Sequence, residues 1–259
     1  MKANEIVTMT ETPLLPYTLR LADTALVLGH RLSEWVGHSP VIEEDLAFGN
    51  MGLDLIGQAR SLYSYAGEIE GKGRDEDALA YLRDAPEYRN ILLVEQPNGD
   101  FATTMVRQLL YAAFAHPYFE ALARSKDAML AAIAAKAVKE MAYHLRHSAE
   151  WIIRLGDGTE ESHRRAQDAL DDLWPYTAEM FETDQVERAL IEAGVAIDPT
   201  SLRATWDKTL DRVLSEATLE RPRNGYMQSG GRIGHHSEHL GHILSELQFL
   251  QRAYPGATW

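Results

Sequence analysis

The chain has 259 residues, of which 45% are hydrophobic and 25% are charged, and its formal net charge at pH 7 is −14. This composition is ordinary for a globular protein with a large core. The acidic balance argues against nucleic acid or an anionic membrane as the main partner, because both bind basic surfaces. The sequence contains no cysteine, which excludes disulfides, zinc–thiolate sites, iron–sulfur clusters and a cysteine nucleophile.

No apolar run approaches the length of a membrane span, and the first residues lack the apolar core of a signal peptide. We therefore expect a cytoplasmic protein. Residues 1–15 are mostly polar and are predicted to form a loose N-terminal lead-in. Residues 16–259 contain neither an internal repeat nor a linker, so they are predicted to form one domain.

The first predicted helix covers residues 17–36, where apolar residues recur at helical spacing before a glycine ends it. Ser39 and Pro40 form a start signal for a second helix that continues to about residue 70. Three glycines inside this second helix each cost about 1 kcal/mol relative to alanine, so we expect another backbone to approach closely there. They are Gly49, Gly52 and Gly57.

The middle of the chain gives one weak strand signal among further helices. The alternatives for residues 88–95 are a brief strand and an irregular buried segment. A long helix is predicted over 101–124 with a bend at Pro117, and a longer one over 126–155 that Ser125 caps. Further helices are predicted over 160–182, 184–193, 198–219 and 233–253. The sequence therefore predicts an all-α fold, a single domain built from helices of bundle length.

The helix over 126–155 carries Glu140 and His144 near its middle, and these residue types hold iron in di-iron bundles. Such bundles use two Glu-x-x-His motifs, because residues three apart project to one point, and a carboxylate from each of two other helices. Glu140 and His144 are four residues apart, so Met141 occupies the acid position. In the second helix the corresponding pair is Asp54 and Gly57, an acid without an imidazole.

The pattern therefore predicts a bundle with a degenerate ligand set. Among the histidines, only His163 has an acid three residues earlier, and that Glu160 is explained by its place in the first turn of a helix. Lys136 and Lys139 lie close enough along the helix to pair with Glu140.

A second candidate metal site is a group of histidines near the C-terminus. If the last helix begins at residue 233, His235, His239 and His242 share one face, and imidazoles at such spacing can bind zinc or iron. No further ligand is indicated by the sequence. Imidazoles at a polar helix start more often hydrogen-bond a neighbouring helix or a partner chain, and we favour that interpretation.

Several stretches of the sequence, read together, resemble one known family. They are LADTALVLGHRLSEWVGHSP, GLDLIGQARSLYSYA, LLVEQPNGDFATTMVRQ, AAKAVKEMAYHLRHSAEW with RLGDGTEES, and GGRIGHHSEHLGHILSELQFLQR. The family that they resemble is that of the structural C subunits of bacterial phenylacetyl-CoA epoxidase complexes. The resemblance extends from about Leu19 to Trp259, and EQPNGDFA and SEHLG are its most specific parts.

The resemblance implies a ferritin-like bundle that is a non-catalytic structural subunit of a multicomponent oxygenase in aerobic phenylacetate degradation. A related catalytic subunit would carry the di-iron centre and epoxidise the ring of phenylacetyl-CoA, with electrons from NADPH delivered by a reductase. This chain would pair with that subunit and stabilise it, without a cofactor or catalytic residue of its own. The candidate contacts within the pair are Gly49, Gly52, Gly57, His236, Glu238 and His239. The alternatives are a self-associating helical protein and a stand-alone metalloprotein with its site on the C-terminal histidines.

Overall fold

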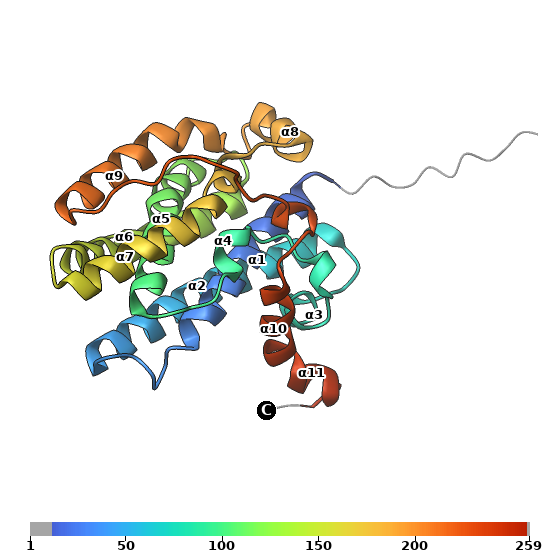
Figure 1. The fold of residues 1–259 in the computed structure, drawn as a ribbon. Coiled ribbons are helices and arrows are strands. Elements are labelled where there is room, and N and C mark those ends of the chain that lie inside the picture. Colours follow the sequence, from blue (N-terminus) through green and yellow to red (C-terminus); the bar gives the residue numbers. More distant parts are fainter. Residues whose placement is uncertain (1–11, 258–259) are drawn as a thin grey trace, which may run out of the picture.

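Four long helices pair two by two in the computed structural model, which describes residues 12–257 (Figure 1). Helix α1 packs along α2, α5 packs along α6, and α2 also contacts α6, so the four form a bundle. Helices α7 and α9 lie against α5 and α6. The bounds of these helices are α1 (Leu14–Ser33), α2 (Ile42–Glu70), α5 (Phe101–Leu122), α6 (Ala128–Gly156), α7 (Glu160–Leu173) and α9 (Arg203–Glu216).

Shorter helices connect and cover this bundle, and no strand occurs within residues 12–257, so the prediction of an all-α fold is confirmed. The short helices are α3 (Glu76–Tyr81), α4 (Leu92–Glu95), α8 (Gln185–Ala193), α10 (Glu238–Leu247) and α11 (Phe249–Ala253). Most of the predicted lead-in, residues 1–11, lies outside the described residues, and α1 begins at Leu14.

One continuous core joins the helices, because each of them except α11 turns apolar side chains inward. Leu28 of α1, Met51 and Leu55 of α2, Leu110 of α5 and Met141 of α6 are all fully buried. Burying one such side chain contributes about 2 kcal/mol relative to leaving it exposed.

Two predicted helix starts are wrong because the capping side chain bonds elsewhere. Helix α2 begins at Ile42 rather than at Pro40, and the Ser39 hydroxyl donates to the Trp35 carbonyl at 3.3 Å. Helix α6 is capped by Asp127, whose carboxylate accepts from the Leu130 amide at 2.9 Å. Ser125, the predicted cap, donates to a distant carbonyl instead.

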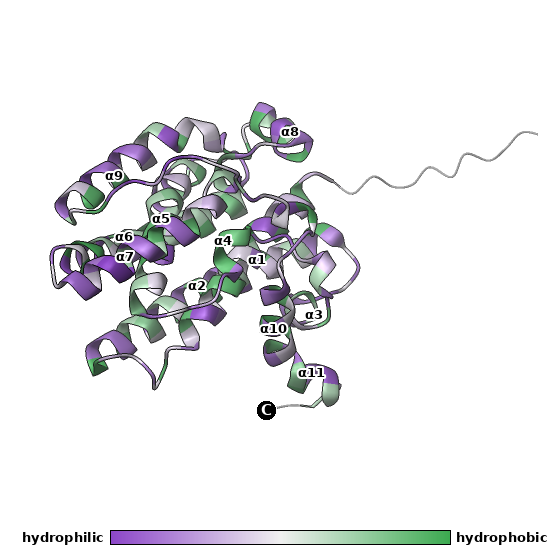
Figure 2. Ribbon diagram, in the orientation of Figure 1, coloured by the Kyte–Doolittle hydropathy of each residue, from purple (hydrophilic) through white to green (hydrophobic). Residues whose placement is uncertain are grey.

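Three other predicted segments differ from the structure. Residues 92–95 form the buried helix α4, which is coloured hydrophobic in Figure 2, rather than a strand. The helix predicted over 160–182 ends at Leu173, and 3₁₀ turns follow around Pro175, because proline has no amide hydrogen to continue the helix. The last long helix begins at Glu238 rather than at residue 233.

The expected close backbone approach occurs at one of the three glycines of α2. A Cβ at Gly52 would lie 2.9 Å from the Ser33 Oγ and 3.3 Å from the Gly29 carbonyl oxygen, so α1 and α2 touch there. Gly52 is therefore buried inside the chain, and its assignment as a partner contact is wrong. A Cβ at Gly49 or Gly57 would meet nothing closer than 3.8 Å.

Candidate functional site

His144 is the centre of a polar row that runs between α2, α5 and α6. Its ring is fully buried, with Nδ1 3.0 Å from Nε2 of Gln108 in α5 and Nε2 3.2 Å from Oδ2 of Asp54 in α2. When the Gln108 amide donates to Nδ1, the ring proton stays on Nε2 and is donated to Asp54. The imidazole thus connects three helices and has no free lone pair for a metal.

Two further contacts between α2 and α6 extend the row. Nε2 of Gln58 donates to Glu140 at 2.8 Å, and Nζ of Lys136 lies 3.5 Å from the same carboxylate, which confirms the predicted pairing of Lys136 with Glu140. Nε2 of His147 lies 2.8 Å from Glu44. Burial lowers the pKa of His147 even though the Glu44 carboxylate opposes this shift.

The ligand positions of a di-iron bundle do not fit two metal ions here. Of the four positions, Gly57 has no side chain and faces Nζ of Lys136, and Met141 is a fully buried thioether. Asp54 and His144 remain, and they hydrogen-bond each other. Across residues 12–257, no three His, Asp or Glu side chains come together in a way that could hold a metal ion.

The alternative of a metal site on the C-terminal histidines, which the sequence analysis did not favour, is contradicted, because its geometry depended on an earlier helix start. His235 precedes α10 and follows Gly234, whose φ of 88° ends a 3₁₀ turn, so His235 does not share a helix face with His239 and His242.

The side chain of His236 is only 4% exposed and bonds within this chain, so it offers little surface to a partner. Its Nδ1 lies 2.9 Å from Glu95 and its Nε2 lies 3.0 Å from the Tyr88 carbonyl oxygen. These bonds match the favoured interpretation of the histidines as hydrogen-bonding groups. Glu238 is exposed and His239 is partly exposed, so both stay candidates for a partner contact.

Comparisons with known proteins agree with this bundle. A family model described as "Phenylacetic acid catabolic protein" matches residues 1–259. The chain belongs to this family. It is also 51% identical over 246 residues to the C subunit of the 1,2-phenylacetyl-CoA epoxidase of Escherichia coli (strain K12), a match that covers 95% of this chain and 99% of that protein. The fold of the phenylacetic acid catabolic proteins is ferritin-like, and the bundle has that fold. No helix within residues 12–257 is long and apolar enough to cross a membrane.

The EQPNGD segment of this family member serves the structure. The buried Arg107 guanidinium donates to the Gln96 carbonyl at 2.5 Å and to the Asn98 side chain, and burial lowers its pKa to about 9. Asp100 accepts from the Thr103 amide at 2.9 Å and caps α5. Each of these polar side chains thus fixes the turn between α4 and α5.

Glu95 of the same segment anchors the C-terminal part of the chain. It is fully buried and accepts from the Asn90 amide group at 3.0 Å, from the Ser237 backbone amide at 2.7 Å and from His236. Burial lowers the pKa of His236, but the bonds to Glu95 and to the Tyr88 carbonyl outweigh it, so the pKa is raised. The protonated ring can donate from both nitrogens, which both acceptors require.

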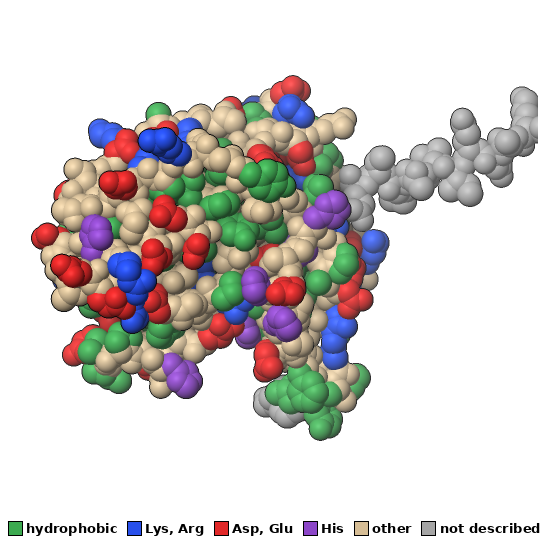
Figure 3. Space-filling model, viewed as in Figure 1, with side chains coloured by type: hydrophobic (Ala, Val, Ile, Leu, Met, Phe, Trp, Pro, Cys, Tyr) green, Lys and Arg blue, Asp and Glu red, His purple; other side chains and the backbone are tan. Residues whose placement is uncertain are grey.

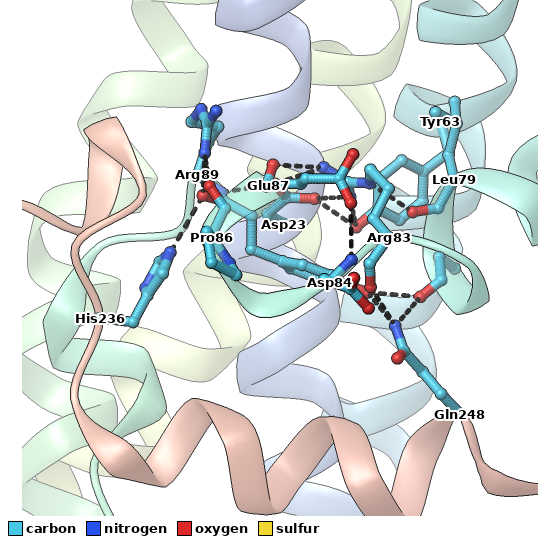
Figure 4. A network of polar contacts seen from close by, with 12 residues as sticks. Asp23, Tyr63, Leu79, Arg83, Asp84, Pro86, Glu87, Arg89, His236 and Gln248 are labelled. Atoms are coloured by element: carbon cyan, nitrogen blue, oxygen red, sulfur yellow. Dashed lines mark hydrogen bonds and ion pairs between the residues drawn. The ribbon is translucent and has the colours of Figure 1, made fainter.

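A second buried network lies beside this anchor (Figure 4). The Asp23 carboxylate is ion-paired with Arg83 and accepts from the Tyr63 hydroxyl at 2.5 Å and from the Arg89 amide at 2.7 Å. Gln248, which follows α10, donates to the Arg83 carbonyl at 2.9 Å. Both ends of α10 are therefore fixed to the segment between α3 and α4.

An internal cavity of about 60 Å³ lies among α1, α5 and the 3₁₀ turns before α8, with Tyr17, Phe114, Tyr118 and Met180 in its wall. This volume holds a few water molecules and is far too small for a coenzyme A ester. Nε of Arg20, which also lines the cavity, has no hydrogen-bond partner within the chain. A water molecule in the cavity would give this nitrogen a hydrogen-bond acceptor.

The sequence predicted some residues of this site but not others. The register of α2 and α6 placed Asp54 opposite His144, and the structure brings them together. Gln108 was missed because α5 is apolar on nearly every face, so no periodicity distinguishes its inward polar residues. Glu95 was missed because two of its partners, His236 and Ser237, lie more than a hundred residues away in the chain.

Proposed function

We propose that this chain is a non-catalytic structural subunit of a phenylacetyl-CoA epoxidase. In this role the chain pairs with a related subunit, which holds the di-iron centre, and the chain stabilises that subunit. The family membership and the 51% identity to the C subunit of such an epoxidase support the assignment to this complex.

The observation that carries the non-catalytic role is the bonding of His144. A metal-ligating imidazole needs one ring nitrogen with a free lone pair. Here Asp54 and Gln108 occupy both nitrogens, and the neighbouring ligand positions hold Gly57 and Met141. The polar groups that would surround two irons instead bond one another and connect the helices.

Iron, dioxygen and NADPH belong to the other components in this proposal. The di-iron centre of the partner would activate dioxygen for epoxidation, and a reductase would supply electrons from NADPH. This chain's own residues supply a rigid bundle whose surface holds the partner.

Metal analysis of the purified chain, alone and after co-expression with the di-iron subunit, tests the proposal. We expect no stoichiometric iron on the chain alone, a stable complex with the partner, and epoxidation only by the complex with its reductase. Binding of about two irons per chain, as in a complete di-iron bundle, together with oxygen-dependent turnover by the chain alone, would overturn it.

A further inference from the structure

Helix α2 carries a row of exposed apolar side chains on the face that points away from the bundle. Ile42, Leu46, Leu53 and Ile56 are 66%, 62%, 68% and 39% exposed. Together with Gly49 they are spaced by four, three, four and three residues, so they form one line along the helix. We call Ile42, Leu46, Gly49, Leu53 and Ile56 the α2 apolar stripe.

The stripe makes α2 apolar on two opposite faces, because Met51, Leu55 and Leu62 of the same helix are buried in the bundle. A helix on the surface of a globular protein normally has one apolar face toward the core and a polar face toward solvent, so the second apolar face of α2 is unusual. The stripe is about 21 Å long at 1.5 Å per residue. Figure 3 shows hydrophobic side chains gathered at the lower left, where α2 begins. Contiguous apolar patches of this kind mark interaction sites on soluble proteins.

The spacing and the glycine indicate a helix as the occupant. Alternation of three and four residues is the pattern of a helix that packs lengthwise against a second helix. Gly49, at the centre of the stripe, is not crowded by its own chain, since a Cβ there would make only an ordinary contact with Val36 at 3.8 Å. The fold of the chain itself does not require a glycine at this position, whereas a closely packed helix from another chain does.

The ends of the stripe carry opposite charges. Glu43 and Asp45 lie at its start, whereas Arg60 and Lys136 lie near its end. The two basic side chains pair with Glu76 and Glu140 within this chain but remain 76% and 69% exposed. An antiparallel helix would place its own start at the end of the stripe and its own end at the start of the stripe. Such a helix with acids at its own start and bases at its end would match both ends of the stripe.

The α2 helix of a second copy would carry the same order of charges, but each copy has a net charge of −14, and this repulsion disfavours the association of two copies. A different and less acidic chain avoids this repulsion. We propose that the α2 apolar stripe receives an antiparallel helix of the di-iron subunit, with the closest approach at Gly49. The identity of this partner rests on the proposed function above.

Binding measurements with stripe variants of the full chain test this proposal. The variant Leu46→Gln/Leu53→Gln removes two central apolar contacts without changing charge, and we expect affinity for the di-iron subunit to fall by about 100-fold. Leu82→Gln is the matched control, because Leu82 is 59% exposed and lies outside the stripe. It should bind like the unchanged chain.

Gly49→Leu is a second variant that leaves folding intact, because the space at Gly49 is open and leucine favours helix. It should melt no lower than the unchanged chain and yet bind the partner at least about 30-fold more weakly, since the side chain blocks the close approach.

The possible outcomes distinguish a failure of the proposed interface from a failure of the proposed function. If the unchanged chain and the di-iron subunit do not associate at all, the proposed function fails. If they associate and both stripe variants bind within about threefold of the unchanged chain, the stripe is not the interface and the proposed function stands. If the chain alone is a dimer that the stripe variants dissociate while partner binding persists, the stripe binds a second copy, and the proposal is overturned.

Discussion

His144 connects three helices through two ring nitrogens, in the place where a related fold would hold metal. Its partners are the amide of Gln108 and the carboxylate of Asp54. A metal ion satisfies buried polar groups by ligation, and a bundle without the ion must satisfy them with hydrogen bonds or replace them. In this chain Met141 and Gly57 stand at two of the candidate ligand positions, and the polar side chains of Asp54 and His144 bond each other.

The variant His144→Ala should lower the free energy of unfolding by about 3 kcal/mol, because it leaves a cavity and an unsatisfied buried amide at Gln108. Urea denaturation measures this change. His242→Ala is the control, since His242 is exposed, and it should stay within about 0.5 kcal/mol of the unchanged chain. Equal stability of the two variants would show that the polar row contributes nothing to folding.

His236 should make stability depend on pH. Its pKa in the folded chain is raised above the ordinary 6.5, so the protonated ring favours the folded state. The advantage of the unchanged chain over His236→Gln should be full below pH 6.5 and shrink as pH rises through the raised pKa. Denaturant midpoints measured across this range give the trend.

His147 supplies the contrast for this pH profile, because burial lowers its pKa. The advantage of the unchanged chain over His147→Gln should be full above pH 6.5 and shrink as pH falls below that value. Profiles of the two variants that run in the same direction would contradict both assignments.

At the scale of single elements, periodicity predicted which helices exist but not where each begins. Ser39 and Ser125 are good local caps, yet each hydroxyl bonds to a carbonyl that the fold brings near. The start of α10 is displaced because Gly231 and Gly234 press against the backbone of residues 86–92. A Cβ at Gly231 would lie 2.2 Å from the Asn90 carbonyl oxygen, and no local pattern announces that contact.

The same limit explains the candidate site. His144 was found because it has a fixed register on the strongly periodic helix α6, and Asp54 was found because it starts the corresponding pair of positions with Gly57 in α2. Gly49 and Gly52 looked equivalent in the sequence, because the sequence alone does not distinguish a glycine that packs inside the chain from a glycine that faces outward. Only the position of α1 separates them, since it covers Gly52 and leaves Gly49 open.

Leucine at each glycine should therefore have opposite effects on the isolated chain. Gly52→Leu should destabilise it by about 2 kcal/mol or more, because the side chain forces α1 away from α2. Gly49→Leu should stabilise it by up to about 1 kcal/mol through higher helix propensity. Thermal unfolding of the two variants measures these opposite effects. A stabilised Gly52→Leu variant would disprove the close packing of α1 on α2.

At the scale of the whole molecule, the chain returns on itself after α9 and brings its C-terminal segment back to α4 (Figure 1). Glu179 organises this return. Its fully buried carboxylate accepts from the backbone amides of Leu92 at 2.7 Å, Gly230 at 3.1 Å and Arg232 at 3.2 Å. Burial raises the pKa of Glu179, although these three amides oppose the shift. One side chain thus joins three segments that are far apart in the sequence.

Replacing Glu179 should loosen the C-terminal segment before the bundle. Glu179→Ala leaves three buried amides without an acceptor, at a cost of about 1–3 kcal/mol each, whereas Glu179→Gln keeps one acceptor oxygen and should have a smaller effect. Hydrogen exchange measured by mass spectrometry should rise in residues 221–257 and stay low in α5 and α6, which serve as the internal reference. Since none of the three amides belongs to α2, we expect Glu179→Gln to keep its affinity for the di-iron subunit. Loss of that affinity, with α2 still protected from exchange, would mean that the C-terminal segment and not α2 holds the partner.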